Sequence, residues 1–189
     1  MPVDAQSWVA TWDALCVSVT RNSPARVTAA IAGSDLREFA DQDSASNWLR
    51  DDHGSRRFDP RGWFATGTVD DWTFVWEDNG YQGITPATAF KMADGHRLES
   101  MFWNVNLQMR FIEVRDRAVT RNFVPFAWGQ EWSWVGELGE PLPGEADLAW
   151  VDAPQLSGLA LLSMTAGIRA VFPDWLDLPD TRFWGHYYP

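Results

Sequence analysis

The 189-residue chain is poor in the residue types that build common catalytic and metal sites: it has one cysteine, Cys16, and three histidines. A single cysteine excludes an intramolecular disulfide, and its apolar neighbours predict a small core residue rather than a nucleophile. No run approaches the ~20 apolar residues that a membrane span requires. Residues 1–11 lack the basic and apolar regions of a secretory signal. The sequence therefore predicts a soluble, cytoplasmic protein.

Sequence motifs for catalysis and cofactor binding are also missing. His53, His96 and His186 form no pair at helical spacing, and the chain contains neither HExxH nor CxxC. A zinc site would need distant residues to converge, so we expect no metal and no cofactor. A nucleophile elbow, a phosphate-binding loop and a dinucleotide fingerprint are absent as well. We predict no catalytic residue and favour a protein that is not an enzyme, although the sequence leaves this question open.

Positive charge is scarce, since the chain carries 15 Lys and Arg against 26 Asp and Glu, a formal net charge of −11. A nucleic-acid binder needs a positive surface for the phosphates, which this charge disfavours. Adsorption to an anionic membrane leaflet is disfavoured for the same reason. Acidity keeps an aromatic-rich protein in solution, and it would also attract a basic protein partner.

Tryptophan, in contrast, is abundant, with 13 residues spread along the whole chain. Each indole favours apolar packing and a partner for its N–H group. Because the tryptophans are not gathered at one point, they predict a large core, with some aromatic surface left over for a ligand or partner.

We predict one domain over residues 1–189, with an N-terminal region at 1–61 that contains one strand and several helices. The pair Ser23-Pro24 joins an N-cap residue to a proline at the first helical position, which predicts a helix over 24–32. The other elements expected here are a short helix at 7–13, a strand at 15–20, and helical fragments at 36–40 and 46–50.

Residues 62–124 form the predicted β-rich centre. In 72–77, Trp72, Phe74 and Trp76 share one face of a strand, because side chains alternate between the two faces. Thr85-Pro86 predicts a helix that continues to residue 93. The expected strands are 63–68, 72–77, 97–105, 108–115 and 118–124.

Residues 125–189 are predicted to form a Trp-rich loop over 126–153, a helix from Pro154 to near Gly167, and an aromatic tail. The tail FWGHYYP predicts either a closing strand or an exposed adhesive segment. Short links between successive strands favour an α+β fold, an antiparallel meander of about five or six strands flanked by short N-terminal helices and a C-terminal helix.

Two clusters of polar residues are candidate binding sites. In the first, a strand ends in Trp-Glu before an Asn-Gly turn, which would place Glu77, Asn79 and Gln82 together at a sheet edge. In the second, Phe102, Asn104 and Asn106 share one strand face beside Trp103. Buried amides need hydrogen-bond partners, so that face is either exposed, paired with backbone, or part of a polar pocket. Turn formation and packing are the competing explanation for both clusters.

Four segments carry a resemblance to a family: CVSVTRNSPARVTAAIAG, WEDNGYQGITP, ESMFWNVNLQMRFIEVRD and TAGIRAVFPDWL. They resemble an uncharacterised actinobacterial, tryptophan-rich domain of unknown function. The sequence departs from that pattern at Tyr81, where a tryptophan would be expected, and at Arg21-Asn22, where a glycine would be expected. The resemblance implies one domain and no particular activity.

The first functional hypothesis is a non-enzymatic module that binds a protein partner through acidic and aromatic surface. A regulatory role, or an immunity-like role against a basic toxin, would use charge to speed encounter and aromatic side chains to hold the partner. The second hypothesis is a small-molecule-binding domain or enzyme whose pocket contains Glu77, Asn79, Gln82, Asn104 and Asn106.

Overall fold

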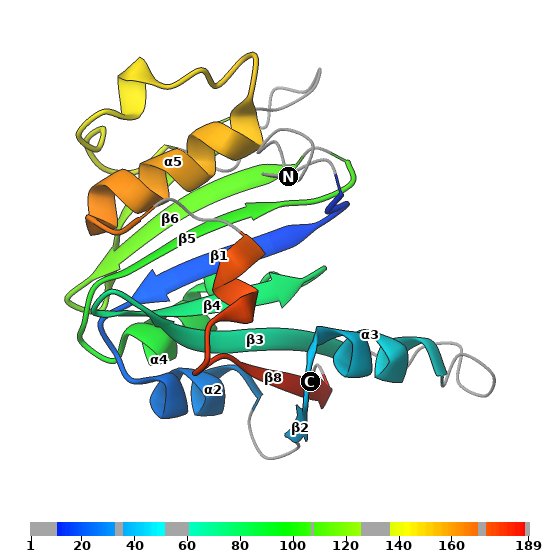
Figure 1. Cartoon of the computed structure of the whole chain (residues 1–189). Coiled ribbons are helices and arrows are strands. Elements are labelled where there is room, and N and C mark those ends of the chain that lie inside the picture. The colour runs from blue at the N-terminus through cyan, green and yellow to red at the C-terminus, as the bar shows by residue number, and fades with distance from the viewer. Residues whose placement is uncertain are drawn as a thin grey trace.

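An eight-stranded antiparallel sheet forms the centre of the computed structural model, in the order β2-β8-β3-β4-β1-β5-β6-β7 (Figure 1). The structure describes residues 11–32, 36–51, 61–106, 108–125, 137–169 and 173–187. The strands are β1 (Leu15–Thr20), β2 (Arg37–Phe39), β3 (Arg61–Val69), β4 (Trp72–Asp78), β5 (Leu98–Trp103), β6 (Met109–Arg115), β7 (Ala118–Phe123) and β8 (Arg182–Tyr187).

Helices cover both faces of this sheet. The longer ones are α2 (Pro24–Ala32), α3 (Gln42–Asp51), α4 (Pro86–Ala93) and α5 (Pro154–Ala166). Three short 3₁₀ turns accompany them, η1 (Gln82–Ile84), η2 (Glu145–Asp147) and η3 (Pro173–Asp177). Prolines occupy the first turns of α4 and α5, where a missing N–H costs nothing, and Gly167 ends α5 with φ of 68°.

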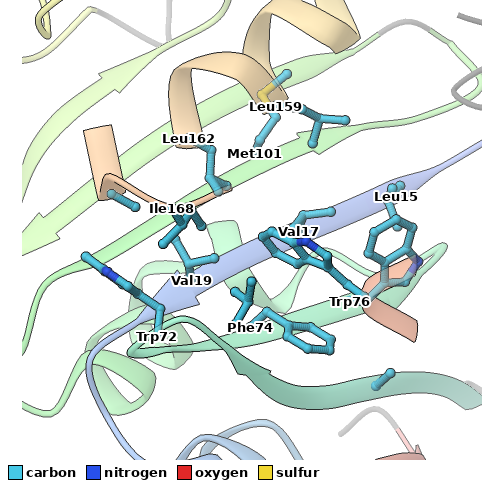
Figure 2. Packing of buried hydrophobic residues seen from close by; sticks show 14 of the residues in the cluster. Leu15, Val17, Val19, Trp72, Phe74, Trp76, Met101, Leu159, Leu162 and Ile168 are labelled. Atoms are coloured by element: carbon cyan, nitrogen blue, oxygen red, sulfur yellow. The ribbon is translucent and has the colours of Figure 1, made fainter. Parts of the chain in front are cut away.

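The two faces of the sheet bury separate apolar clusters. Trp72, Phe74 and Trp76 of β4 pack with α5 and η3 on one face, as Figure 2 shows for part of the cluster. Val75 packs with α2 and α4 on the other face. This alternation confirms the predicted faces of the strand. Because both faces are covered, nearly every residue of β4 is buried.

The predicted strand count was too low, and the predicted meander was wrong in part. Strand β1 lies between β4 and β5, so the hairpin β3–β4 and the meander β5–β6–β7 are joined through the first strand of the chain. All six residues of β1 are buried, as a central strand requires. The segment 36–40, predicted as a helical fragment, instead contains β2 because it pairs with β8.

The tail provides the eighth strand. Strand β8 pairs with β3 on one side and with β2 on the other, so the aromatic end of the chain forms an interior strand next to the edge strand β2. The predicted helix at 7–13 falls mostly outside the described residues, and residues 11–13 are not helical. Of the predicted loop 126–153, only 137–153 lies within the described residues, and it includes η2.

The tryptophans that the structure describes are core or half-buried residues. Trp63, Trp72, Trp76, Trp103 and Trp175 are buried. Trp12, Trp48, Trp150 and Trp184 are half-buried. None of these nine is exposed, so the described tryptophans provide packing more than free surface. Trp8, Trp128, Trp132 and Trp134 lie outside the described residues.

None of the helices in the described ranges is long and apolar enough to cross a bilayer.

Candidate functional site

Glu77 lies near the end of β4 with only 1% of its surface exposed. Its two carboxylate oxygens accept hydrogen bonds from the backbone N–H groups of Gln82 and Gly83, each at 2.8 Å. Both donors belong to η1, the short turn that follows the strand. The carboxylate therefore fastens the loop after β4 onto the sheet. Glu77 and Gln82 meet as predicted, but at the end of an interior strand rather than at a sheet edge.

Two glycines let the loop approach this carboxylate closely. A Cβ atom at Gly80 would lie 2.6 Å from Oε2 of Glu77. A Cβ atom at Gly83 would lie 2.6 Å from Oγ of Ser100 and would also collide with Ser18. The glycines of the sequence GYQG are therefore required by the contact between the loop backbone and the side chains beneath it.

Burial raises the pKa of Glu77 to about 7, because a charged carboxylate loses hydration there. The backbone N–H groups of Gln82 and Gly83 and the Cys16 side chain favour the charged form and oppose this effect. Burial also raises the pKa of Cys16, and the neighbouring Glu77 adds to that shift. A fully buried thiol held in its neutral form is a poor nucleophile, which agrees with the prediction of a core residue.

Small polar side chains continue from Glu77 across the sheet beneath η1. Cys16 is the cross-strand neighbour of Glu77 and lies 3.3 Å from Oγ of Ser100. Ser100 in turn lies 2.8 Å from Oγ of Ser18. These side chains satisfy one another in a space that Gly83 closes. The arrangement is a buried hydrogen-bond network that positions the loop.

The second candidate cluster lies in a turn and not on a strand. Strand β5 ends at Trp103, so Asn104 and Asn106 do not share a strand face with Phe102, and that prediction was wrong. The side-chain Oδ1 of Asn104 accepts hydrogen bonds from the backbone N–H groups of Asn106 and Gln108, each at 3.0 Å. The amide satisfies the backbone of its own turn, which is the usual function of asparagine there. Trp103 is buried and donates its indole N–H to the Trp12 carbonyl.

The fold brings both clusters to the same end of the sheet. Asp78 of β4 and Trp103 of β5 are cross-strand neighbours of the same β1 residue, Leu15. Two strand spacings place them about 10 Å apart. The loop after β4 exposes Asn79 and Tyr81, and the β5–β6 hairpin exposes Val105 and Asn106.

Tyr187 of β8 lies at the same end of the sheet. Its cross-strand partner is Arg61, the first residue of β3, and the start of β3 lies beside Asp78 at the end of β4. Tyr81, Val105 and Tyr187 expose 49%, 70% and 46% of their surface. We call the group Asn79, Tyr81, Val105, Asn106 and Tyr187 the turn end. It spans from β8 to β5, four strand spacings or about 19 Å. The turn end presents aromatic, apolar and amide side chains suited to contact with another molecule.

A buried ionic network on the face beneath α5 was not found from the sequence. Glu99 and Glu113 are cross-strand neighbours, and Arg97 forms ion pairs with both. Desolvation raises the pKa of Glu99 to about 7, and Thr165 of α5 donates a hydrogen bond to it. Glu99 lies on the same face of β5 as the core residues Met101 and Trp103, because the three are spaced two residues apart. This spacing is a sequence signal that could have identified Glu99 as a buried acid.

Arg121 of β7 forms a second network at the edge of the sheet. It is 1% exposed, forms ion pairs with Glu137 and Glu145, and donates to the carbonyl oxygens of Leu138 and Gly139. Its guanidinium holds residues 137–145 against β7. Both networks pair charges within the protein, which offsets the cost of burying Glu99, Glu113, Arg121 and Glu145.

The histidines occupy three different settings. His53 lies outside the described residues, whereas His96 is exposed. His186 is buried on β8 against the ring of Phe64, and desolvation lowers its pKa to about 4. Within the described ranges, histidine, cysteine and acidic residues form no group that could hold a metal ion.

Residues 7–131 match the family of unknown function DUF6461. The chain belongs to this family. The match includes the Glu77 loop, the Asn104 turn and strands β1 to β7, so the candidate site except for Tyr187 lies within the matched residues. No curated protein and no solved structure matches the chain. The actinobacterial source suggested by the resemblance stays a prediction.

Proposed function

We propose that the protein is a non-enzymatic cytoplasmic module that binds a basic protein partner, with an immunity-like or regulatory role. The observation that carries the proposal is the state of the Glu77 carboxylate, whose two oxygens hold backbone N–H groups of the adjoining loop. This carboxylate shapes the Tyr81 loop and is buried away from solvent. What the turn end offers to solvent is a set of tyrosine, valine and asparagine side chains.

The residue types exposed at the turn end are ones that are common in protein–protein interfaces. Tyrosine is enriched in them because a large, rigid ring contributes area at low entropy cost, and its hydroxyl group tolerates water. Amides such as those of Asn79 and Asn106 suit a polar rim. The turn end therefore supplies the aromatic part of the proposed contact surface.

Charge supports a basic partner. The net charge of −11 favours rapid encounter with a protein of opposite sign and repels nucleic acid. Arg97 and Arg121 are already paired with buried glutamates, so part of the small cationic complement is used inside the fold. The exposed acidic residues consequently exceed the exposed basic ones across the described surface.

Affinity capture from host lysate tests the proposal at low and at moderate salt. The tagged protein should retain a stoichiometric partner that is lost as salt rises. Tyr81→Ala combined with Val105→Ser should reduce recovery at least tenfold, because both side chains are exposed at the turn end. Thr68→Ala, an exposed position at the other end of the β3–β4 hairpin, is the matched control.

Two results would contradict the proposal. One is a folded bait that captures no partner at low salt. The other is a partner whose recovery is the same for the wild type, the Tyr81/Val105 double variant and Thr68→Ala.

A small-molecule-binding or enzymatic role around Glu77 and Asn104 is the second proposal. It is favoured by the pKa of Glu77, near 7, which suits proton transfer at neutral pH. A metabolite thermal-shift screen tests it. A ligand response that Glu77→Gln or Asn104→Ala abolishes in a folded protein would support this role, and an unchanged response in both variants would reject these residues.

A further inference from the structure

Helix α5 is an apolar helix with no charged residue in its 13 positions. Its inner side packs on the sheet, where Leu159 and Leu162 join the core and Gly158 lies against Met101. Leu156, Ala160 and Met164 are spaced four residues apart and form a stripe on the outer side; Leu156 and Ala160 are half-buried, Leu156 also packs against the core, and Met164 is exposed. Met164 exposes 53% of its surface. A soluble helix normally carries polar residues there, so this outer stripe is a candidate contact surface.

The chain around this stripe carries charge of one sign. Residues 137–168 contain five acidic residues and no basic residue. Glu145 is buried against Arg121, whereas Glu140, Asp147 and Asp152 are exposed. Figure 1 shows residues 137–153 looping along the outer side of α5. A side chain at Gly144 would collide with Met164, so this segment borders the stripe directly.

Other exposed apolar side chains lie in the same segment. Val151 exposes 81% of its surface just before α5 begins, and Leu138 exposes 49% beside β7. From Leu156 to Met164 the helix axis rises about 12 Å. An apolar stripe of this length beside acidic residues matches about two turns of an amphipathic helix with a basic polar face.

We propose that the outer surface of α5, together with residues 137–153, binds a basic amphipathic helix of a protein partner. This surface, the α5 surface, lies on the face of the sheet opposite to η1, to which the Tyr81 loop of the turn end leads. The proposal goes beyond the proposed function because it names a second surface and the form of its ligand.

Charge complementarity favours a basic helix over two other possible occupants of the α5 surface, a second copy of the chain and an anionic lipid surface. A second copy of the chain that used the same surface would bring the acidic segment against itself, and like charges at an interface repel each other. An anionic lipid surface would be repelled in the same way. Lysine and arginine side chains next to Glu140, Asp147 and Asp152 would instead find opposite charges, while their apolar neighbours cover Met164 and Val151.

The test uses a fluorescein-labelled helical peptide of leucine and lysine, about four turns long, and a matched peptide with glutamate in place of lysine. Fluorescence anisotropy measures their binding to the full chain at two salt concentrations. The basic peptide should bind, more weakly at higher salt, and the acidic peptide should not. Met164→Ser should weaken binding at least fivefold, and Asp147→Asn with Asp152→Asn at least tenfold.

Two control variants make the outcome decisive. Asp43→Asn with Asp180→Asn removes the same charge from exposed positions outside the 137–168 segment and should leave the dissociation constant within twofold. Tyr81→Ala, at the turn end, should also leave it unchanged. Equal weakening by the two aspartate pairs would show attraction to net charge alone and would overturn the proposal. Loss of peptide binding in Tyr81→Ala, with none in Met164→Ser, would place the helix at the turn end, which contradicts this inference and supports the proposed function.

Discussion

Replacing Glu77 by glutamine should remove a defined part of the pH dependence of folding. In the folded protein the pKa of Glu77 is about 7, against an ordinary value of 4.5. The folded state therefore binds this proton more tightly than the unfolded state does. The contribution of the protonated carboxyl to stability is fully present below pH 4.5 and is lost as pH rises through about 7. A shift of this size corresponds to about 3 kcal/mol.

Glutamine cannot ionise, so the variant should not lose this contribution between pH 5 and pH 8. At pH 5 the variant should be less stable than the wild type by about 1–3 kcal/mol, because its amide cannot accept both N–H groups of Gln82 and Gly83. At pH 8 the loss of this hydrogen bond in the variant is offset, because the wild type then buries the charge of ionised Glu77 and the variant does not. The difference between variant and wild type should therefore move by about 3 kcal/mol in favour of the variant from pH 5 to pH 8.

Urea denaturation at pH 5, 6, 7 and 8 measures this difference, with Asp43→Asn as an exposed control. Comparing the variant with the wild type is necessary because other groups titrate in the same range. His186, whose folded pKa is about 4, has the opposite effect and gains stability as pH rises toward 6.5. A free-energy difference between variant and wild type that stays constant from pH 5 to pH 8 would refute the argument from burial.

Two further predictions concern Gly83, which packs over Ser18 and Ser100, and Arg121, which lies on the edge strand β7. Gly83→Ala should destabilise the protein by about 1–3 kcal/mol in urea denaturation, because its Cβ would collide with Ser100 and Ser18; unchanged stability would mean that η1 is not packed as described. Arg121→Met should cost about 3–5 kcal/mol, since it leaves Glu145 without its cation. Hydrogen exchange of residues 137–145 should also accelerate more than that of β1 in this variant, and uniform acceleration would show that Arg121 does not hold the segment.

Local patterns in the sequence predicted most elements correctly. Alternation of large apolar residues identified the β4 faces, and prolines at helix starts identified α2, α4 and α5. These signals depend on neighbouring residues, so they can be read before any tertiary contact is known. The same patterns gave the wrong structure for 36–40, because a three-residue strand such as β2 exists only through its pairing with β8.

The candidate site could be predicted only in part. The Asn-Gly turn and the nearby acid pointed to Glu77 and Gln82, which the structure brings together. The sequence did not predict that Glu77 and Gln82 are buried where the loop containing Gly80 and Gly83 packs on the sheet. This packing depends on Ser18 and Ser100, which belong to strands far apart in the chain. The position of Asn104 was misjudged because a strand end cannot be located by alternation alone.

The sequence by itself determined an acidic chain rich in tryptophan, with strands in its centre and helices that begin at prolines. Only the tertiary structure decided that β1 enters between β4 and β5, that β8 lies between β2 and β3, and that two turns and Tyr187 lie at the same end of the sheet. The physical reason is the range of the interactions. Periodicity and capping act within a few residues, whereas strand order depends on long-range pairing and on which faces can be buried together.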